Sequence, residues 1–189
     1  DRTVELINNE DFNIDEIPLD DKKTFELFST GRMIGVFQLE SRIAQITARS
    51  LKPTRFEEIV ALVALIRPGP LGANMHIEFA DRATGKKEIE FLHTDLKEIL
   101  EETYGVILYQ EQVMQLSRAL ANFSAGDSDV LRKAIGKKKR KVINANRPKF
   151  VNGAVEKGLG EKFANNLFDL ILKFAGYGFN KSHSTGYSI

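Results

Sequence analysis

Two segments of the sequence carry residues suited to binding phosphate groups. Residues 131–139 are rich in lysine and arginine, and residues 174–184 join a Gly-Tyr-Gly turn to a lysine and a histidine. A polyphosphate spreads its charge over oxygens that accept charge-assisted hydrogen bonds, so arginine, lysine and the free N–H groups at a helix start all suit it. Together the two segments predict a surface that binds anions.

The second segment could form a helix start that presents backbone N–H groups to an anion. Asn180 or Ser182 would cap this helix, beside Lys181 and His183. The glycines of the preceding turn let the backbone pass close to a ligand or to another helix. In the alternative interpretation, Lys181 is a surface lysine and His183 is a histidine packed at the helix start.

Charge is distributed unevenly, although the net charge is only +1. Residues 1–28 contain nine Asp or Glu against three Lys or Arg, and residues 132–149 contain nine Lys or Arg and no acid. The basic stretch is typical of a surface that contacts phosphates, although a solvated helix face would look the same. Its densest part could follow a DNA backbone or form a solvated helix end, and includes Lys137, Lys138, Lys139 and Arg140.

The spacing of apolar residues predicts the helices that would position these segments. A first helix should end at Gly31, and a second, over residues 56–66, should stop at Arg-Pro-Gly-Pro, which should form a rigid turn. Further helices are expected over residues 74–82, 95–100, 112–120, 125–135, 142–157 and 163–174. Short strands are expected at residues 33–37 and 106–109, where β-branched and aromatic residues gather. The predicted fold is mainly α with short β segments, in an irregular multi-helix arrangement.

Polar residues at the predicted helix ends have local roles that compete with functional ones. Asp20 or Asp21 would cap the first helix, and Ser124 with Asp127 loosely matches a capping box. Asp127 and Asp129 lie two residues apart and point in nearly opposite directions on a helix, so they cannot share a metal ion. We interpret both as first-turn carboxylates stabilised by the helix dipole.

Composition excludes several classes of protein. Of the 189 residues, 42% are hydrophobic, which is enough for one core or for two small cores packed together. Cysteine is absent and the three histidines lack ligand-like spacing, so we expect neither disulfides nor a metal site. No apolar run reaches the length of a membrane helix and no signal peptide is visible, so we expect a soluble, cytoplasmic protein without a membrane partner. The start at Asp1 and the absence of a final helix-stop signal suggest a fragment.

Several longer motifs also occur in a fixed order along the chain. They are Ile-Pro-Leu-Asp-Asp at 17–21, Gly-Val-Phe-Gln-Leu-Glu-Ser at 35–41, Ala-Leu-Ile-Arg-Pro-Gly-Pro at 64–70, Glu-Thr-Tyr-Gly-Val-Ile-Leu-Tyr-Gln-Glu-Gln-Val-Met at 102–114, and the two phosphate-binding segments. In their residues and their order they resemble motifs of the alpha subunits of bacterial DNA polymerase III, which are replicative polymerases of the C family. The resemblance covers essentially the whole chain. It implies that residues 1–50 are the end of the palm with its connection to the fingers, and that residues 51–189 are the fingers domain.

The resemblance further implies that these fingers close over an incoming deoxynucleoside triphosphate. By motif position, Arg132, Lys133, Lys181 and His183 would contact the triphosphate. Lys133 stands where the family usually has a second arginine. Lysine keeps the positive charge but cannot make the bidentate hydrogen bonds of a guanidinium. The implied partners are the deoxynucleoside triphosphate, primer-template DNA, and other replicase subunits reached through the parent chain.

Phosphoryl transfer by a polymerase also needs carboxylates that hold two metal ions. The resemblance places the family's three metal-binding aspartates upstream of Asp1, so Mg²⁺ would belong to the parent enzyme. This segment alone would then hold no catalytic residue and would be inactive. Two other classes stay open: a non-enzymatic helical module that binds nucleic acid, and a domain whose acidic stretch docks a basic partner. Arg67 is also ambiguous, because it could reach nucleic acid or cap a backbone carbonyl.

Overall fold

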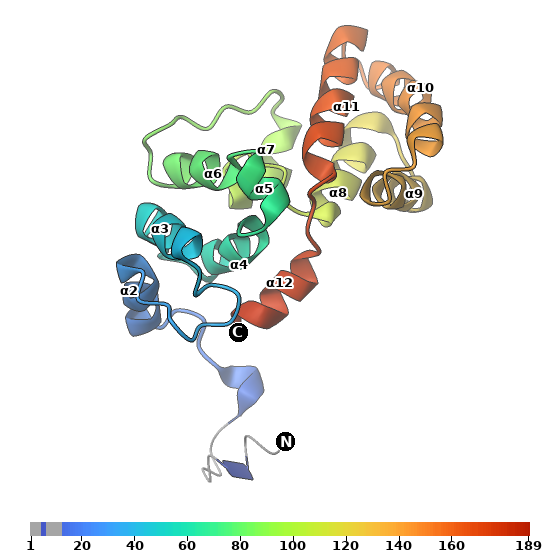
Figure 1. The fold of residues 1–189 in the computed structure, drawn as a ribbon. Helices are drawn as coiled ribbons and strands as arrows, with labels where there is room; N and C mark the ends of the chain where they lie inside the picture. Colours follow the sequence, from blue (N-terminus) through green and yellow to red (C-terminus); the bar gives the residue numbers. More distant parts are fainter. Residues whose placement is uncertain (1–4, 7–12) are drawn as a thin grey trace.

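The computed structural model describes residues 5–6 and 13–189, and helices dominate them (Figure 1). The N-terminal group comprises η1 (Ile14–Glu16), α2 (Lys22–Thr30), α3 (Arg42–Leu51), α4 (Phe56–Leu65), α5 (Pro68–Gly72) and α6 (Met75–Ala83). The next elements are α7 (Asp95–Leu100) and η2 (Glu101–Thr103). The C-terminal group comprises α8 (Gln110–Ala121), α9 (Ala125–Gly136), α10 (Arg140–Glu156) and α11 (Glu161–Ala175), while α12 (Lys181–Ser188) returns to the first group. Helix α7 packs against α8 of the C-terminal group. The predicted helical class is confirmed. None of the helices described here is long and apolar enough to cross a membrane.

The predicted short β segments are wrong, because residues 13–189 contain no strand. Residues 33–37 form turns instead. The N–H of Val36 donates to the carbonyl of Met33 at 3.1 Å, and Gly35 and Gln38 adopt positive φ angles of 85° and 63°. Such angles turn the chain back on itself and are incompatible with a strand.

Residues 106–109 are extended, yet they pair with another segment at a single point, a parallel bridge between Tyr109 and Phe179. A side chain rather than a neighbouring strand bonds two of their N–H groups. The Oε1 atom of Gln112 accepts from the N–H groups of Leu108 and Tyr109 at 2.8 and 2.9 Å. The segment is apolar because it is buried, and no ladder of strands forms there.

Local capping sets several helix ends as the sequence predicts. The carboxylate of Asp21 accepts from the N–H of Thr24 at 2.7 Å and starts α2, which ends at Gly31 with a φ of 71°. Ser124 and Asp127 form the predicted capping box at the start of α9. These ends depend on residues within one turn of each other, which explains why sequence alone finds them.

The Arg-Pro-Gly-Pro sequence ends α4 as predicted, but it does not form a simple turn. Helix α4 stops at Leu65, and Pro68 begins the short helix α5. Proline fits a first helical turn because its missing N–H would have no partner there and its φ is already helical. The prediction of a rigid turn at this position is therefore wrong.

Helix α4 lies at the centre of the N-terminal group. Each of residues 59–65 exposes 4% or less of its surface. One side of the helix belongs to a core with Phe79 of α6, and another side to a core with Phe28 of α2. On a further side the hydroxyl of Ser184 on α12 donates to the carbonyl of Val60. Helix α4 thus fixes α12 relative to the rest of the group.

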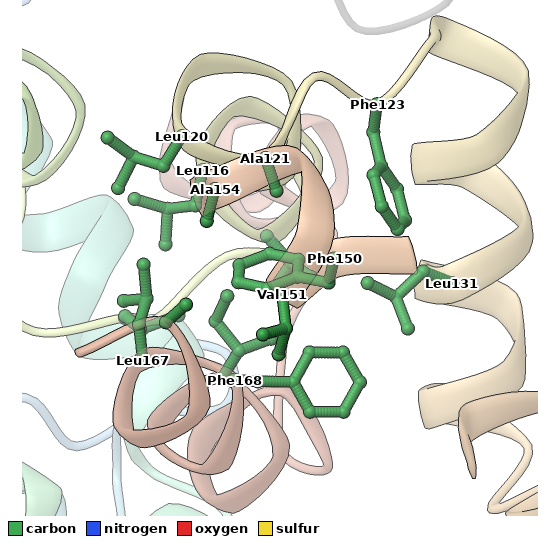
Figure 2. Close-up of a cluster of buried hydrophobic side chains, with 14 of the residues drawn as sticks. Leu116, Leu120, Ala121, Phe123, Leu131, Phe150, Val151, Ala154, Leu167 and Phe168 are labelled. Carbon is green, nitrogen blue, oxygen red and sulfur yellow. The ribbon is translucent and has the colours of Figure 1, made fainter. Parts of the chain in front are cut away.

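Aromatic rings fill the core of the C-terminal group (Figure 2). Phe150 of α10 is fully buried between Phe123 and Phe168, with ring centroids 5.8 and 5.2 Å away in edge-to-face geometry. Helices α8 and α10 approach so closely that a Cβ on Gly153 would lie 2.1 Å from the carbonyl oxygen of Ala121. This packing holds α8, α9, α10 and α11 together as one unit.

Candidate functional site

Two chain segments meet at the start of α8 and bring two helix starts together. The N–H of Phe179 donates to the carbonyl of Leu108 at 3.0 Å, and the N–H of Gln110 donates to the carbonyl of Phe179 at 2.9 Å. Each segment continues directly into a helix, the first into α8 and the second into α12. Helices α8 and α12 therefore begin side by side, although 70 residues separate Glu111 from Lys181 in the sequence.

Arg132 reaches this junction from α9. Its Nη1 donates to Oε1 of Gln110 at 2.9 Å, and the Nε2 of Gln110 donates to the carbonyl of Gly178 at 3.2 Å. The remaining side of the guanidinium faces Asp129, whose Oδ1 accepts from Nε at 3.0 Å and from Nη2 at 2.6 Å. Arg132 is thus tied both to the start of α8 and to the Gly-Tyr-Gly turn that precedes α12.

Lys133 lies beside Arg132 and shares its carboxylate. The Nζ of Lys133 is 2.6 Å from Oδ2 of Asp129, and 58% of the Lys133 side chain is exposed. Hydrogen bonds from Lys133 and then from Arg132 hold the pKa of Asp129 below its ordinary value. One carboxylate therefore pairs with two of the cations that the sequence singled out, and one positive charge is left over.

Lys181 lies at the other side of the same junction, at the first position of α12. Its backbone N–H donates to Oε2 of Glu111 at 3.2 Å, and its Nζ donates to Oε2 of Glu102 at 2.6 Å. The Nζ also lies 5.7 Å from the ring centroid of Tyr109. Arg132 and Lys181 are thus linked through the consecutive residues Gln110 and Glu111.

The start of α12 is capped by Asn180, one of the two predicted caps, but it is not open to an anion as expected. Oδ1 of Asn180 accepts from the N–H of His183 at 2.8 Å. Glu111 accepts from the side-chain amide of Asn180 at 3.0 Å and from the N–H of Lys181. A neighbouring helix therefore supplies the negative charge that the dipole of α12 attracts.

His183 belongs to a row of rings along α12. Its ring centroid lies 5.4 Å from that of Phe179 and 4.7 Å from that of Tyr187. Tyr187 in turn stacks on Phe37 at 5.0 Å, and Phe37 and Tyr187 expose 63% and 50% of their surfaces. Exposed rings of this kind suit stacking of a nucleobase.

Arg67, at the start of α5, contacts the Gly-Tyr-Gly turn. Its guanidinium donates to the carbonyls of Ala64 and Tyr177 at 2.9 and 2.7 Å, and lies 4.2 Å from the ring centroid of Phe179. Burial lowers the pKa of Arg67. Gly69 packs against the Tyr177 ring so closely that a Cβ would lie 2.3 Å from it. Of the two roles considered for Arg67, the structure shows the carbonyl contacts.

The basic run lies one turn further along the chain, where α9 connects to α10. Its four cations at residues 137–140 are exposed, and Lys138 adopts a positive φ of 52° in this connection. A groove of about 420 Å³ separates the run from the Gly-Tyr-Gly turn and has Lys138, Arg140 and Tyr177 among its lining residues. The Gly-Tyr-Gly turn thus borders the groove on one side and contacts Gln110 of the junction on the other.

The carboxylates predicted at the start of α9 have different partners. Asp127 lies in the first turn, where hydrogen bonds from Lys149 and Ser124 hold its pKa at about 2. Asp129 lies beyond that turn and pairs with Arg132, so the first-turn interpretation is right for Asp127 only. Across the part of the chain that the structure describes, no three His, Asp or Glu side chains form a group that could hold a metal ion.

Sequence reasoning missed the polar partners of the cations. Gln110 and Glu111 served only as part of a longer motif, and Glu102 had no assigned role. The available signal was a cluster of polar side chains at the start of a helix that follows a buried apolar segment, at residues 106–112. That pattern indicates a helix start with neighbours, but it does not identify them.

Comparisons with known proteins agree with the motifs. The family model described as the bacterial DNA polymerase III alpha subunit finger domain matches residues 1–158, which include Arg132, Lys133 and the basic run. The DNA polymerase III subunit alpha of Caulobacter vibrioides is 46% identical over 190 residues, covering 100% of this chain and 16% of its own length. Those of Escherichia coli K12 and Aquifex aeolicus are 47% and 48% identical over 94% of this chain, which is 16% and 15% of their own lengths. The chain thus spans about a sixth of the relatives it matches. It belongs to the family of bacterial DNA polymerase III alpha subunit finger domains.

Proposed function

We propose that this chain binds the triphosphate of an incoming deoxynucleotide and contacts the DNA backbone, as the fingers segment of a DNA-directed DNA polymerase. The observation that carries the proposal is the convergence of Arg132 and Lys181 on the first turn of α8. The two residues come from segments far apart in the sequence, and Gln110 and Glu111 hold them at one junction. Family membership supports the proposed reaction class, and the convergence of the two cations supports a substrate site at this junction.

The proposed site uses each cation in a different way. The guanidinium of Arg132 keeps one N–H on each Nη atom for phosphate oxygens, because Asp129 and Gln110 accept from its other three N–H groups. Lys133 adds a mobile charge beside it. Lys181 approaches from α12, and His183 extends the site toward the exposed rings. Such groups stabilise the negative charge that spreads over the phosphates during transfer.

We also propose a domain division and the partners of this chain. Residues 1–50 would be the end of the palm with its connection, and residues 51–189 the fingers. One core cluster contains side chains from both sides of position 50, such as Ala48 and Ile59. Other replicase subunits would bind through the parent chain, and Mg²⁺ would be held there. The described residues contain no group of three His, Asp or Glu side chains that could hold a metal ion, and we propose that the segment alone is inactive.

Triphosphate binding tests the proposal directly. In the full-length protein, Lys181→Ala should weaken dATP affinity by about tenfold, because it removes a charge-assisted hydrogen bond. Lys97→Ala is the control, since Lys97 is an exposed lysine on α7. Isothermal titration calorimetry measures both affinities. Equal affinities in the two variants would remove Lys181 from the site.

A second candidate function is DNA binding through residues 137–140 alone, and the exposure of all four cations favours it. Replacing the four with glutamine should reduce the log–log dependence of DNA affinity on salt by about 0.9 for each phosphate that these cations neutralise. The double variant Lys22→Gln and Lys23→Gln on α2 is the control. An unchanged slope would contradict DNA binding by this run. A reduced slope in a protein that does not bind dATP would favour the second function over the first.

The hypothesis of an acidic docking stretch falls partly on residues that the structure does not describe. Residues 1–4 and 7–12 lie outside the described part of the chain. Helix α2, which carries the last acidic residue of the stretch, Glu26, packs against α3. No observation here favours docking over the proposed function.

A further inference from the structure

Two buried polar atoms beside Lys181 have no hydrogen-bond partner among the described residues. They are the hydroxyl of Tyr109 and Oε1 of Glu102. A buried polar atom without a partner costs about 1–3 kcal/mol in general, so native proteins rarely keep one without a reason. Here a donor and an acceptor are both unpaired in one neighbourhood.

The two atoms are chemically complementary. Burial raises the pKa of the Tyr109 hydroxyl, and the charges of Glu102, Glu111 and Glu57 raise it further, so the hydroxyl keeps its proton and can donate. Oε1 of Glu102 is free to accept, whereas Oε2 accepts from the Nζ of Lys181 at 2.6 Å. Lys181 also lies against the ring of Tyr109, with Nζ 5.7 Å from the ring centroid. Lys181 therefore borders both unpaired groups.

We propose that Glu102 is a positioning residue. Its carboxylate pairs with Lys181 in the free protein and accepts a hydrogen bond from the Tyr109 hydroxyl when a phosphate binds Lys181. This inference rests on the proposed function of Lys181. In the free state, Glu102 places the ammonium at the start of α12. In the bound state, the phosphate replaces the carboxylate on Lys181, and Glu102 accepts from Tyr109. Each of the three groups then has a partner.

Asp129 does not offer the same exchange, although it also pairs with predicted site residues. Both of its oxygens are bonded, to Arg132 and to Lys133. No buried donor near it is without a partner among the residues the structure describes. Glu102 thus has a second hydrogen-bond donor nearby, the Tyr109 hydroxyl, whereas Asp129 has no such unpaired donor in the described part of the chain.

The proposal predicts a gain of affinity where a purely structural role predicts a loss. Glu102→Gln keeps the shape and removes the charge that competes with phosphate. We expect dATP to bind about fivefold more tightly, in line with the strength of a partly exposed ion pair. Glu98→Gln on α7 is the matched control and should leave the affinity unchanged. Unchanged or weaker dATP binding by Glu102→Gln would overturn the proposal.

Tyr109→Phe tests the second half of the exchange. Its hydroxyl has no partner in the free protein, so the thermal unfolding midpoint should not fall. Affinity for dATP should fall by about threefold, because Glu102 then has no donor to accept from in the bound state. A fall in the unfolding midpoint without a fall in affinity would contradict the exchange. Lys181→Ala, measured alongside, separates the two proposals: if it binds dATP normally, the site itself fails rather than the exchange.

Discussion

Replacing Arg132 with alanine should lower kcat/KM for nucleotide incorporation by about a hundredfold, the scale seen when one preorganised donor to a developing charge is removed. The guanidinium is the most firmly positioned cation of the site. Gln110 and Asp129 bind it from two sides, and only 27% of the side chain is exposed. A group held in this way loses little freedom when it binds phosphate, so its removal costs more than the removal of a mobile lysine. Steady-state incorporation by the full-length polymerase on a primed template measures the effect.

Arg147→Ala is the matched control for this experiment. Arg147 also pairs with a carboxylate and an amide, Asp169 and Asn165, and 32% of its side chain is exposed. It lies on α10 with its guanidinium over Phe168, away from the start of α8. Both variants lose a partly buried ion pair, so their effects on stability should be alike. If Arg147→Ala reduces incorporation as much as Arg132→Ala does, the loss reflects folding and not substrate binding.

Arg132→Lys should recover part of the activity, because the charge stays and the two-point fork is lost. The protein itself allows a comparison of arginine with lysine at two neighbouring positions. Arg132 is bonded on two sides, whereas Lys133 holds a single contact to Asp129 and is 58% exposed. The structure thus holds Lys133 less firmly than Arg132. It also explains why we expect the larger effect at Arg132.

Helix ends were predictable from sequence because each depends on residues close together in the chain. Asp21, Ser124 and Asn180 all cap helices through side chains that bond within three residues. Helix α3 has the same signal at Ser41, but it was missed. Its buried residues include Ala44, Thr47 and Ala48, which are small or polar and give little hydrophobic contrast along the helix.

The predicted strands failed for a different physical reason. Apolar and β-branched residues at 106–109 indicate burial as much as strand pairing, and sequence alone does not separate the two. The structure buries this segment between helices, and the amide oxygen of Gln112 accepts from the N–H groups of Leu108 and Tyr109. A strand needs a partner strand, and the only pairing in the described residues is the bridge to Phe179.

The cations of the candidate site were predictable, but their partners were not. Lysine and arginine clusters stand out in a sequence because they are uncompensated locally. Glu102 compensates Lys181 from 79 residues away, and Gln110 contacts Arg132 from 22 residues away. Only the fold brings these pairs together. The free protein therefore carries a more nearly neutral site than its basic stretches indicate.

Gly153→Ala should lower the free energy of unfolding by about 3 kcal/mol, at the upper end of the usual cost of overpacking. The added methyl carbon would lie 2.1 Å from the carbonyl oxygen of Ala121 and 2.7 Å from its carbonyl carbon. Backbone atoms cannot move aside as a side chain can, so α8 and α10 would have to separate. The side chain of Lys157 donates to the carbonyl of Ala119 at 2.6 Å and Phe150 is buried beside this contact, so separation would disturb both.

Thermal unfolding followed by circular dichroism measures this effect, and for a chain of this size the midpoint should fall by about 6–12 °C. Gly136→Ala is the control. Gly136 is the last residue of α9, and a Cβ there meets no atom within 4 Å. Alanine at an open helical position should stabilise by about 0.5–1 kcal/mol, because glycine loses more backbone entropy on folding. Opposite shifts in the two variants would locate the cost in the contact between α8 and α10, whereas a rise in both would show that the two helices can separate freely.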